Sequence, residues 1–503
     1  MSQSTDGVLV GPSEHLPSAP SVVGSARLVD RLSPRVVRVS TAVGFGAPAI
    51  AYLWMFVHYS VNIVVGDQWD DVTVIRASYH QVIPWEALWA QHNENRMFFP
   101  NLLVIALSRT THFNVHIEEL LGVLLLFAAI ALLIWTHKRR TPDTPWLYYC
   151  PVALLALTLA QWENTLWGFQ VAWYMILLAL VVALYLLDRP SMTVLAFAGA
   201  ATASFVGSLS SSQGLLIWPA GLVLLYHRRR SWPFVVTWCV AAVGTAALYL
   251  HDLNLQKGNS APHYASTHLV ASVKFFLFAI GDVVGVHLNF GQSGSTAVLA
   301  FGAVLVVVAV ALLVFYGIRP DNDGPAPLGL SLIVVGLLFA ATVTQGRSLF
   351  GYFGASASRY TTFDVLVPLG IYLTVVARRP APAPSPAGTG AEVDRSWEDR
   401  MGERADRLPR WADEVALRWI RVVIGLAIVI QVGTSIPLGI QGARNNYVYQ
   451  AQAVPVLRNI AHYPDGYVAY HLYVFSNAKF LRAQAAILEV HHLNIFATGG
   501  IWP

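Results

Sequence analysis

Cysteine is almost absent from this chain of 503 residues, which contains only Cys150 and Cys239. Both lie inside or beside apolar stretches without a metal-binding spacing, so neither a disulfide framework nor a zinc site is indicated. Charged residues are also scarce, because Asp, Glu, Lys and Arg together make up 12% of the chain. So little charge excludes a single soluble core.

A strong basic excess is missing as well, since the formal net charge is only +4. The basic residues stand in short clusters between apolar segments and do not form a stripe interleaved with aromatic residues. This pattern gives no reason to expect a nucleic-acid partner. The clusters fit the anionic headgroups of membrane lipids better.

Hydrophobic residues are abundant: they make up 55% of the chain, and its mean hydropathy is +0.52. These values predict an all-α polytopic membrane protein. Counting apolar runs of roughly 17 to 25 residues, and accepting some shorter ones, predicts about eleven transmembrane helices. We expect them at residues 42–65, 117–136, 147–161, 170–187, 191–208, 214–226, 232–250, 296–316, 328–344, 361–377 and 419–440.

The distribution of basic residues predicts the orientation of these spans. Four arginines precede the first span, and later clusters follow at 137–140, 227–230 and 378–379. The positive-inside rule then places the N-terminus in the cytoplasm and, with an odd number of spans, the C-terminus outside. The expected location is the inner or plasma membrane of a cell, in contact with its lipids.

The remaining segments complete a predicted domain organisation. Residues 1–41 are expected to be a disordered cytoplasmic N-terminus, 42–377 a membrane domain with an outer loop at 66–116, and 378–418 a cytoplasmic linker. After the last span at 419–440, residues 441–503 should form a small extracytoplasmic cap. Two further apolar segments, at 97–112 and 270–290, look interrupted or amphipathic and are expected to lie in the membrane interface.

The outer loop begins with an acidic cluster that contains Asp67, Asp70 and Asp71. Carboxylates directly after a transmembrane helix are costly if they slip inward, so their concentration there indicates a functional site. Asp67 is the best candidate for a catalytic base, and Asp70 is the second. Asp70 and Asp71 could equally cap the helix that follows, because Asp is favoured at helix starts.

Two other polar segments are expected on the same side of the membrane. In the first, His92, Glu94 and Arg96 are spaced by two, so they would share one side of an extended strand; the alternative is an ordinary solvated turn. The second joins the third and fourth spans, and its carboxylate, amide and indole groups suit sugar binding. An interfacial aromatic belt would explain its tryptophans equally well. The candidate substrate-binding residues in these segments are His92, Glu94, Trp162, Glu163 and Gln170.

The order of these features resembles the front end of the C-type (GT-C) glycosyltransferase superfamily, especially the bacterial aminoarabinose and protein mannosyl transferases. Asp67 stands where that family has its catalytic acid, residues 95–103 stand where its second interfacial helix begins, and 117–140 matches the returning span. Ser358-Arg359-Tyr360 resembles a family motif that faces the lipid-linked phosphate. The chain has Asp67-Gln68 where the family has an Asp-Glu pair, and 211–214 lacks the family's lysine.

The resemblance implies an enzyme that transfers a hexose or pentose from a polyprenyl-phosphate donor to a glycan, lipid or protein acceptor in the cell envelope. Such a transfer needs a base and positive charge near the departing phosphate. Asp67 or Asp70 would act as the base, and the residues expected at the phosphate are Arg359, Arg96 and Tyr360. Mg²⁺ or Mn²⁺ could be held by Asp67, Asp70 and Glu94, but nothing in the sequence requires a metal. The rival interpretations are a flippase or transporter of lipid-linked glycans and an inactive membrane scaffold.

Overall fold

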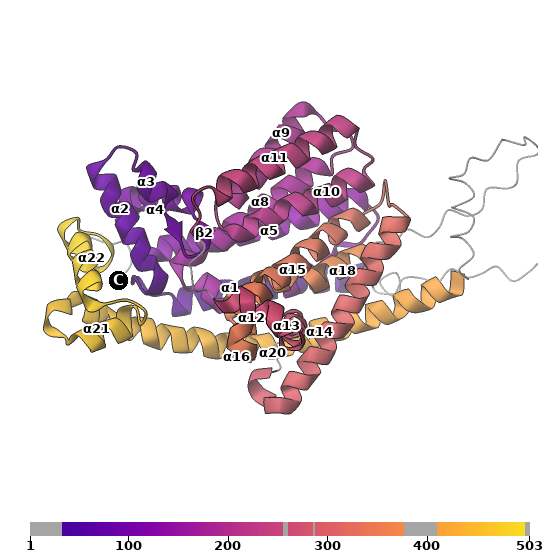
Figure 1. The fold of residues 1–503 in the computed structure, drawn as a ribbon. Helices are drawn as coiled ribbons and strands as arrows, with labels where there is room; N and C mark the ends of the chain where they lie inside the picture. The colour runs from indigo at the N-terminus through magenta and orange to yellow at the C-terminus, as the bar shows by residue number, and fades with distance from the viewer. Residues whose placement is uncertain (1–32, 255–259, 285–286, 377–409, 498–503) are drawn as a thin grey trace, which may run out of the picture.

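The structure is a computed structural model that describes residues 33–254, 260–284, 287–376 and 410–497. Most of the N-terminal segment expected to be disordered, and most of the expected linker at 378–418, lie outside the described residues. The described residues are almost entirely helical. Figure 1 shows a long bundle with a smaller group of short helices at one end.

The α-helices follow one another along the chain as α1 (Pro34–Tyr59), α2 (Trp69–His80), α3 (Trp85–Trp89), α4 (Phe98–Thr111), α5 (Val115–Arg140), α6 (Cys150–Ala156), α7 (Trp162–Thr165), α8 (Val171–Leu187), α9 (Val194–Ser208), α10 (Ile217–His227), α11 (Trp232–Leu250), α12 (Ser260–Thr267), α13 (Leu269–Gly281), α14 (His287–Ile318), α15 (Ala326–Arg347), α16 (Gly351–Ala355), α17 (Thr361–Asp364), α18 (Leu366–Val376), α20 (Arg410–Arg458), α21 (Asp465–Leu472) and α22 (Ala478–Val490). Short 3-10 turns join them at η2 (Gly66–Gln68), η3 (Trp146–Tyr149), η4 (Leu159–Gln161), η5 (Gly168–Gln170), η6 (Ser212–Leu216), η7 (Asp282–Val284), η8 (Ser348–Phe350), η9 (Ser358–Tyr360), η10 (Ile460–His462) and η11 (Asn494–Phe496). The two strands of the described chain, β1 (Gln91–His92) and β2 (Asn95–Arg96), form an antiparallel hairpin.

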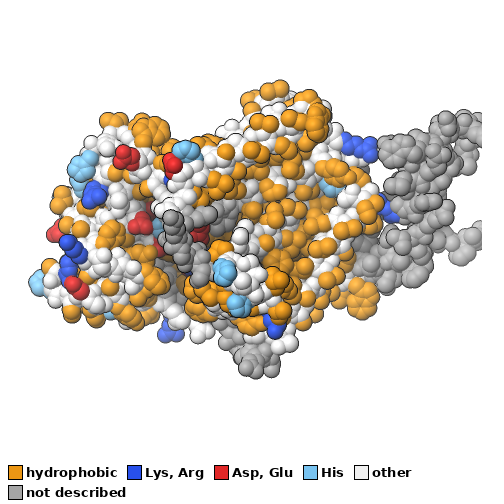
Figure 2. All heavy atoms as spheres, viewed as in Figure 1, with side chains coloured by type: hydrophobic (Ala, Val, Ile, Leu, Met, Phe, Trp, Pro, Cys, Tyr) orange, Lys and Arg blue, Asp and Glu red, His pale blue; other side chains and the backbone are white. Residues whose placement is uncertain are grey.

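Seven helical segments of the described chain are long and apolar enough to cross a membrane. They are Pro34–Tyr59, Val115–Arg140, Gly168–Leu187, Trp232–Leu250, Ser295–Ile318, Ala326–Ala355 and Trp419–Arg458. The pair α12 and α13, bent by 108°, would be an eighth if it forms one broken span. Hydrophobic side chains cover much of the visible surface of the bundle (Figure 2). The chain is therefore an all-α, multi-pass membrane protein.

The predicted number of about eleven spans is not confirmed, because four of the predicted segments form shorter or interrupted helices. The segment at 191–208 contains only the 15-residue helix α9. The segment at 147–161 breaks after Ala156, whose carbonyl accepts a hydrogen bond from the side chain of Gln161. The segments at 214–226 and 361–377 each begin with a short turn, followed by the 11-residue helices α10 and α18. Length and composition alone do not qualify these four segments as spans.

Two predicted spans also end elsewhere than expected. The first stops at Tyr59, and the apolar residues Ile63, Val64 and Val65 continue as extended chain that is buried among the short helices. The last predicted span, at 419–440, is part of the 49-residue helix α20. Consequently, the first part of the segment expected to form a cap is a continuation of this helix.

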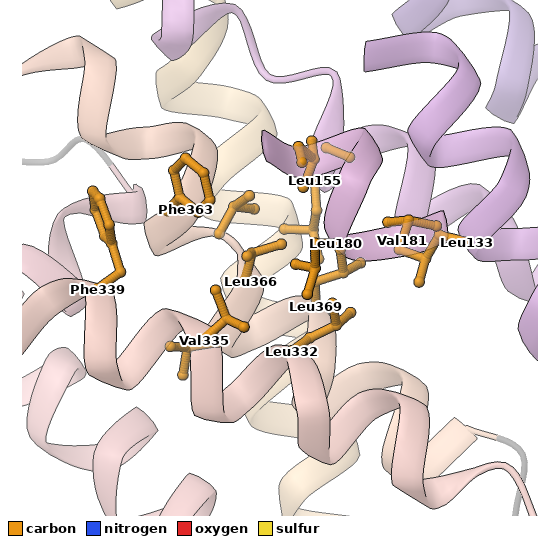
Figure 3. Packing of buried hydrophobic residues seen from close by; sticks show 14 of the residues in the cluster. Leu133, Leu155, Leu180, Val181, Leu332, Val335, Phe339, Phe363, Leu366 and Leu369 are labelled. Atoms are coloured by element: carbon orange, nitrogen blue, oxygen red, sulfur yellow. The ribbon is translucent and has the colours of Figure 1, made fainter. Parts of the chain in front are cut away.

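The interior of the bundle is a continuous apolar core (Figure 3). Leu332 and Val335 of α15 lie close to Leu366 and Leu369 of α18, and α8 contributes to the same cluster. Gly329 and Gly370 allow the backbones of α15 and α18 to approach, because a Cβ on either glycine would lie 2.5 Å from the carbonyl oxygen of the other. Small residues at such crossings provide the close packing on which membrane helices depend.

A second apolar cluster lies at the end of the bundle where α1 ends and α5 begins, which we call the site end. There, Trp69 and Ile75 of α2 are buried with Leu481 and Leu488 of α22. The side-chain nitrogen of Gln484 also donates a hydrogen bond of 2.7 Å to Thr73 Oγ1. The C-terminal helices are thus packed against the outer loop of the sequence prediction, on the left of Figure 1.

The opposite end of the bundle, where α5 ends at Arg140, is called the basic end. Asp188 is buried there between two arginines, with Oδ1 2.6 Å from Arg228 Nη2 and Oδ2 3.0 Å from Arg140 Nε. Arg228 also donates to the carbonyl oxygens of Asn322 and Gly324. This group fastens the ends of α5, α8 and α10 to the loop before α15.

Candidate functional site

The site end holds a group of one histidine and two aspartates, which we call the Asp-His cluster: Asp67, His92 and Asp70. Gly66 has a φ of +61°, a conformation that favours glycine, and a Cβ there would lie 3.0 Å from the ring of Trp167. This turn leads into η2, which carries Asp67, and α2 follows with Asp70 in its first turn. The hairpin brings in His92 from the other side.

His92 lies between the two carboxylates. Its Nδ1 is 2.8 Å from Asp70 Oδ2, and its Nε2 is 3.7 Å from Asp67 Oδ2. The ring of Phe169 packs against the imidazole edge to face, with 5.1 Å between the ring centroids. The side chain of His92 is largely buried, whereas both aspartates keep an exposed surface. The cluster is therefore both fixed in place and accessible from outside.

Tyr473 completes this arrangement from the far end of the chain. Its hydroxyl donates a hydrogen bond of 2.5 Å to Asp67 Oδ1. Tyr473 follows directly after α21, and the packing of α21 and α22 on the outer loop holds it there. Sequence reasoning did not single out this residue, because its only signal was membership of a tyrosine-rich C-terminal segment.

The cluster shifts the pKa values of its members in opposite directions. Burial alone would lower the pKa of His92, but its contacts with Asp67 and Asp70 outweigh burial and raise it to about 10. Burial alone would raise the pKa of Asp67, but the close contact with His92, the hydrogen bond from Tyr473 and the charges of His92 and Arg359 bring it below its usual value. At neutral pH the cluster therefore combines a protonated histidine with an ionised Asp67.

Arg359 lies at the edge of the same site, as its effect on Asp67 indicates. Its Nη1 donates a hydrogen bond of 2.7 Å to Glu163 Oε1, and its backbone nitrogen donates to the other oxygen of that carboxylate. The side chain of Asn164 holds the carbonyl oxygen of Arg359 at 2.8 Å. The turn at 161–165 and the turn before α17 are thus joined, and two of the predicted polar segments meet here.

A second acidic group, Glu118 and Asp71, lies behind the cluster. The sequence analysis pointed to Asp71 but not to Glu118. Glu118 Oε2 accepts a hydrogen bond of 2.7 Å from the side chain of Gln68, and Gly168 leaves room for this contact. Asp71 is also buried, and burial followed by the charge of Glu118 raises its pKa well above the usual value. Glu118 Oε1, Asp71 Oδ2 and Gln68 Oε1 are buried without a hydrogen-bond partner.

The hairpin separates His92, Glu94 and Arg96, so the prediction that they share one side was wrong. Asn93 has a φ of +50° and reverses the chain between them. Glu94 pairs with Arg347 at 3.5 Å, in an exposed position. Arg96 is buried and donates to the carbonyl oxygens of Trp89 and His251, both at 2.6 Å. Its predicted contact with the donor phosphate stays untested, and we leave it out of the proposed site.

The other predicted binding residues lie nearby but are largely enclosed. Tyr360 is buried and stacks on Trp173. Gln170 is buried too, and its Oε1 has no partner. Trp162 packs against Gly442 of α20, where a Cβ would collide with the indole. Their predicted roles in binding substrate are not tested by these positions.

The residues proposed to hold a metal do not assemble around a common point. His92 bridges the two aspartates, while Glu94 faces Arg347. No group of three or more His, Cys, Asp or Glu side chains suited to a metal occurs within the described part of the chain. The prediction of Mg²⁺ or Mn²⁺ stays untested, and the proposed reaction uses no metal.

Comparison of the chain with models of protein families, with curated proteins and with solved structures finds no match.

Proposed function

We propose that this chain is an integral-membrane glycosyltransferase that transfers a sugar from a polyprenyl-phosphate donor to an acceptor of the cell envelope. The observation that carries the proposal is that an ionised, partly exposed Asp67 lies at the same end of an apolar bundle as Arg359, whose charge acts on it. A carboxylate and a guanidinium at this position are the two groups that such a transfer requires. The order of features that resembles the GT-C superfamily supports the same reaction.

In the proposed reaction, Asp67 accepts the proton of a hydroxyl group on the acceptor while the oxygen of that hydroxyl attacks the anomeric carbon of the donor sugar. The bond between that carbon and the phosphate oxygen breaks, and the polyprenyl phosphate leaves with the electron pair. His92 and Tyr473 keep Asp67 oriented through contacts of 3.7 Å and 2.5 Å. Because both hold the ionised form, the carboxylate is ready to accept a proton at neutral pH.

Arg359 would stabilise the negative charge that develops on the departing phosphate. Guanidinium groups suit phosphate because they present several N–H donors in one plane. Glu163 holds Arg359 in position, and the arginine side chain keeps about a third of its surface exposed (35%). We place this end of the bundle on the outer face of the inner or plasma membrane, where lipid-linked sugars rather than nucleotide sugars serve as donors.

The test is transfer by the purified full-length protein in lipid vesicles, with radiolabelled polyprenyl-phosphate hexoses and pentoses and a panel of oligosaccharide acceptors. Asp67→Asn should reduce transfer by about a hundredfold or more, because it removes the base. Asp252→Asn is the matched control, since Asp252 is an exposed carboxylate beyond α11 that pairs with His251. Full activity of Asp67→Asn alongside a normally folded protein would contradict the assignment of the base.

A transporter of lipid-linked glycans is the second candidate, and one observation favours it. Glu118 and Glu119 are buried carboxylates within a segment able to cross a membrane, and ionisable residues in such places often serve transport. The same vesicles distinguish the two functions. Movement of a fluorescent polyprenyl-phosphate sugar between leaflets, without formation of a glycosidic bond, would replace the transferase proposal by transport.

A further inference from the structure

A cavity of about 230 Å³ lies directly beside the Asp-His cluster. It is enclosed by α2, the end of α3, the hairpin, α4 and η5. Asp70 and His92 belong both to the cluster and to the wall of this cavity. A molecule bound in the cavity would therefore touch the cluster. Another cavity, of about 20 Å³ among apolar side chains of the bundle, has room for no more than a water molecule.

The wall of the cavity combines apolar surfaces with a few polar groups. Val74, Met97 and Phe169 provide the apolar part. Thr73 and Asn101 add a hydroxyl and an amide, and both are held in place: Gln484 donates to Thr73, and Asn101 donates to the carbonyl oxygen of Leu88. Apolar walls with a few fixed polar groups are typical of sites for small organic molecules. A sugar ring matches this lining, because its faces carry C–H groups and its edge carries hydroxyls.

Among the polar groups described in this wall, Asp71 has a buried oxygen that lacks a partner. The residue is 4% exposed, and its Oδ2 makes no hydrogen bond. A buried polar atom without a partner is unfavourable, and a bound ligand can provide that partner. Burial and the charge of Glu118 also raise the pKa of Asp71, which favours the uncharged carboxyl. In that form Asp71 can donate a hydrogen bond to a hydroxyl oxygen and accept one in return.

The charges around the cavity select against an anion. Among the described residues that line it there is no lysine or arginine, whereas the carboxylate of Asp70 is one of them. The carboxylates of Asp67 and Glu118 act on Asp71 from nearby. A phosphate or a uronic acid would meet negative charge without a cationic partner, apart from His92, which the two aspartates already engage.

The geometry points to this cavity as an acceptor subsite that takes one uncharged, hydroxyl-bearing sugar ring, with Asp71 as its buried hydrogen-bond partner. The assignment of the bound ring as the acceptor rests on the proposed function, because the ring would lie beside Asp67 and Asp70. The preference for an uncharged ring rests on the residues that line the cavity. An experiment can therefore contradict sugar binding in the cavity and sugar transfer independently of each other.

The experiment is saturation-transfer difference NMR on the full-length protein in nanodiscs. The probes are methyl mannopyranoside, methyl galactopyranoside and methyl arabinofuranoside, compared with methyl glucuronide as an anion. We expect at least one uncharged glycoside to receive saturation and the glucuronide to bind at least about tenfold more weakly, which corresponds to about 1.4 kcal/mol. Asp71→Val should weaken the uncharged probe about fivefold, because a buried hydrogen bond is lost.

Two variants test the location without altering the cluster. Ala87→Phe and Ala90→Phe place a ring at the wall of the cavity and should abolish the signal. Val82→Phe is the matched control, because Val82 is fully exposed outside the cavity and should bind normally. Thermal unfolding of each variant shows whether it is folded, and the second filling position keeps the test valid if the first does not fold.

The outcomes separate the inference from the proposed function. Binding that both filling variants remove, without any transfer by the wild type, supports the subsite and contradicts the transferase. Transfer that proceeds with an unchanged acceptor KM in both filling variants contradicts the subsite and leaves the transferase intact. Tighter binding of the glucuronide than of every uncharged glycoside overturns the preference inferred here.

Discussion

The buried carboxyl groups at the two ends of α5 differ in how many of their oxygens have hydrogen-bond partners. At the basic end, Asp188 receives hydrogen bonds from Arg140 and Arg228 on both of its oxygens. At the site end, Asp71 and Glu118 each keep a buried oxygen without a partner. About 22 residues of helix separate the two groups, or roughly 33 Å. The complete bonding of the first group is typical of a structural fastening, and the incomplete bonding of the second indicates a place for a ligand or a proton.

The largest expected difference between the two ends is in the free energy of unfolding, after substitution of Asp188 at the basic end. We expect Asp188→Asn to reduce the free energy of unfolding by about 3–5 kcal/mol, because it leaves two arginines without their counter-charge. Asp71→Asn, at an equally buried carboxyl, should change it by no more than about 1 kcal/mol. Unfolding of both variants in the same detergent provides the measurement. Similar losses in the two variants would remove the distinction between the ends.

The next effect concerns the charge on His92. Its pKa of about 10 in the folded protein lies above the usual 6.5, so its contribution to stability is complete below pH 6.5 and is lost as the pH rises towards and through 10. Wild type should therefore lose thermal stability relative to His92→Gln between pH 7 and pH 10. If the melting temperatures of the two proteins change with pH in the same way over that range, His92 is not held as a cation.

The smallest effect concerns the link to the C-terminal segment. Tyr473→Phe removes the hydrogen bond to Asp67, which we expect to cost about 1 kcal/mol of stability. It should also raise the pKa of Asp67, and so move the acidic limb of the pH profile of kcat/KM to higher pH. Tyr470→Phe is the control, because Tyr470 lies exposed on α21. An unchanged acidic limb in Tyr473→Phe would contradict a role for this tyrosine in setting the charge of Asp67.

The sequence predicted the all-α membrane class because long apolar runs have few other solutions. It was less informative about where helices break, since a run such as 147–161 is largely apolar, whereas its break accompanies a hydrogen bond from the Gln161 side chain back to Ala156. The first predicted span was too long for a related reason. Residues 63–65 are as apolar as a membrane helix, but they are buried against protein.

The candidate site was only partly predictable. Acidic residues after a span identified Asp67 and Asp70, and the structure places Arg359 and Glu163 near them. Tyr473 was out of reach, because 406 positions separate it from Asp67 and no local pattern marks such a contact. Glu118 did carry a signal, since an acidic residue in the first turn of an apolar span is costly unless it is used.

The bond between Asp67 and Tyr473 has a consequence for biosynthesis. Chains are made from the N-terminus, so Asp67 leaves the ribosome 406 positions ahead of Tyr473. A nascent or truncated chain that lacks α21 and α22 would carry the carboxylate without the hydroxyl that orients it. Completion of the Asp-His cluster therefore has to wait until the segment that carries Tyr473 has been made.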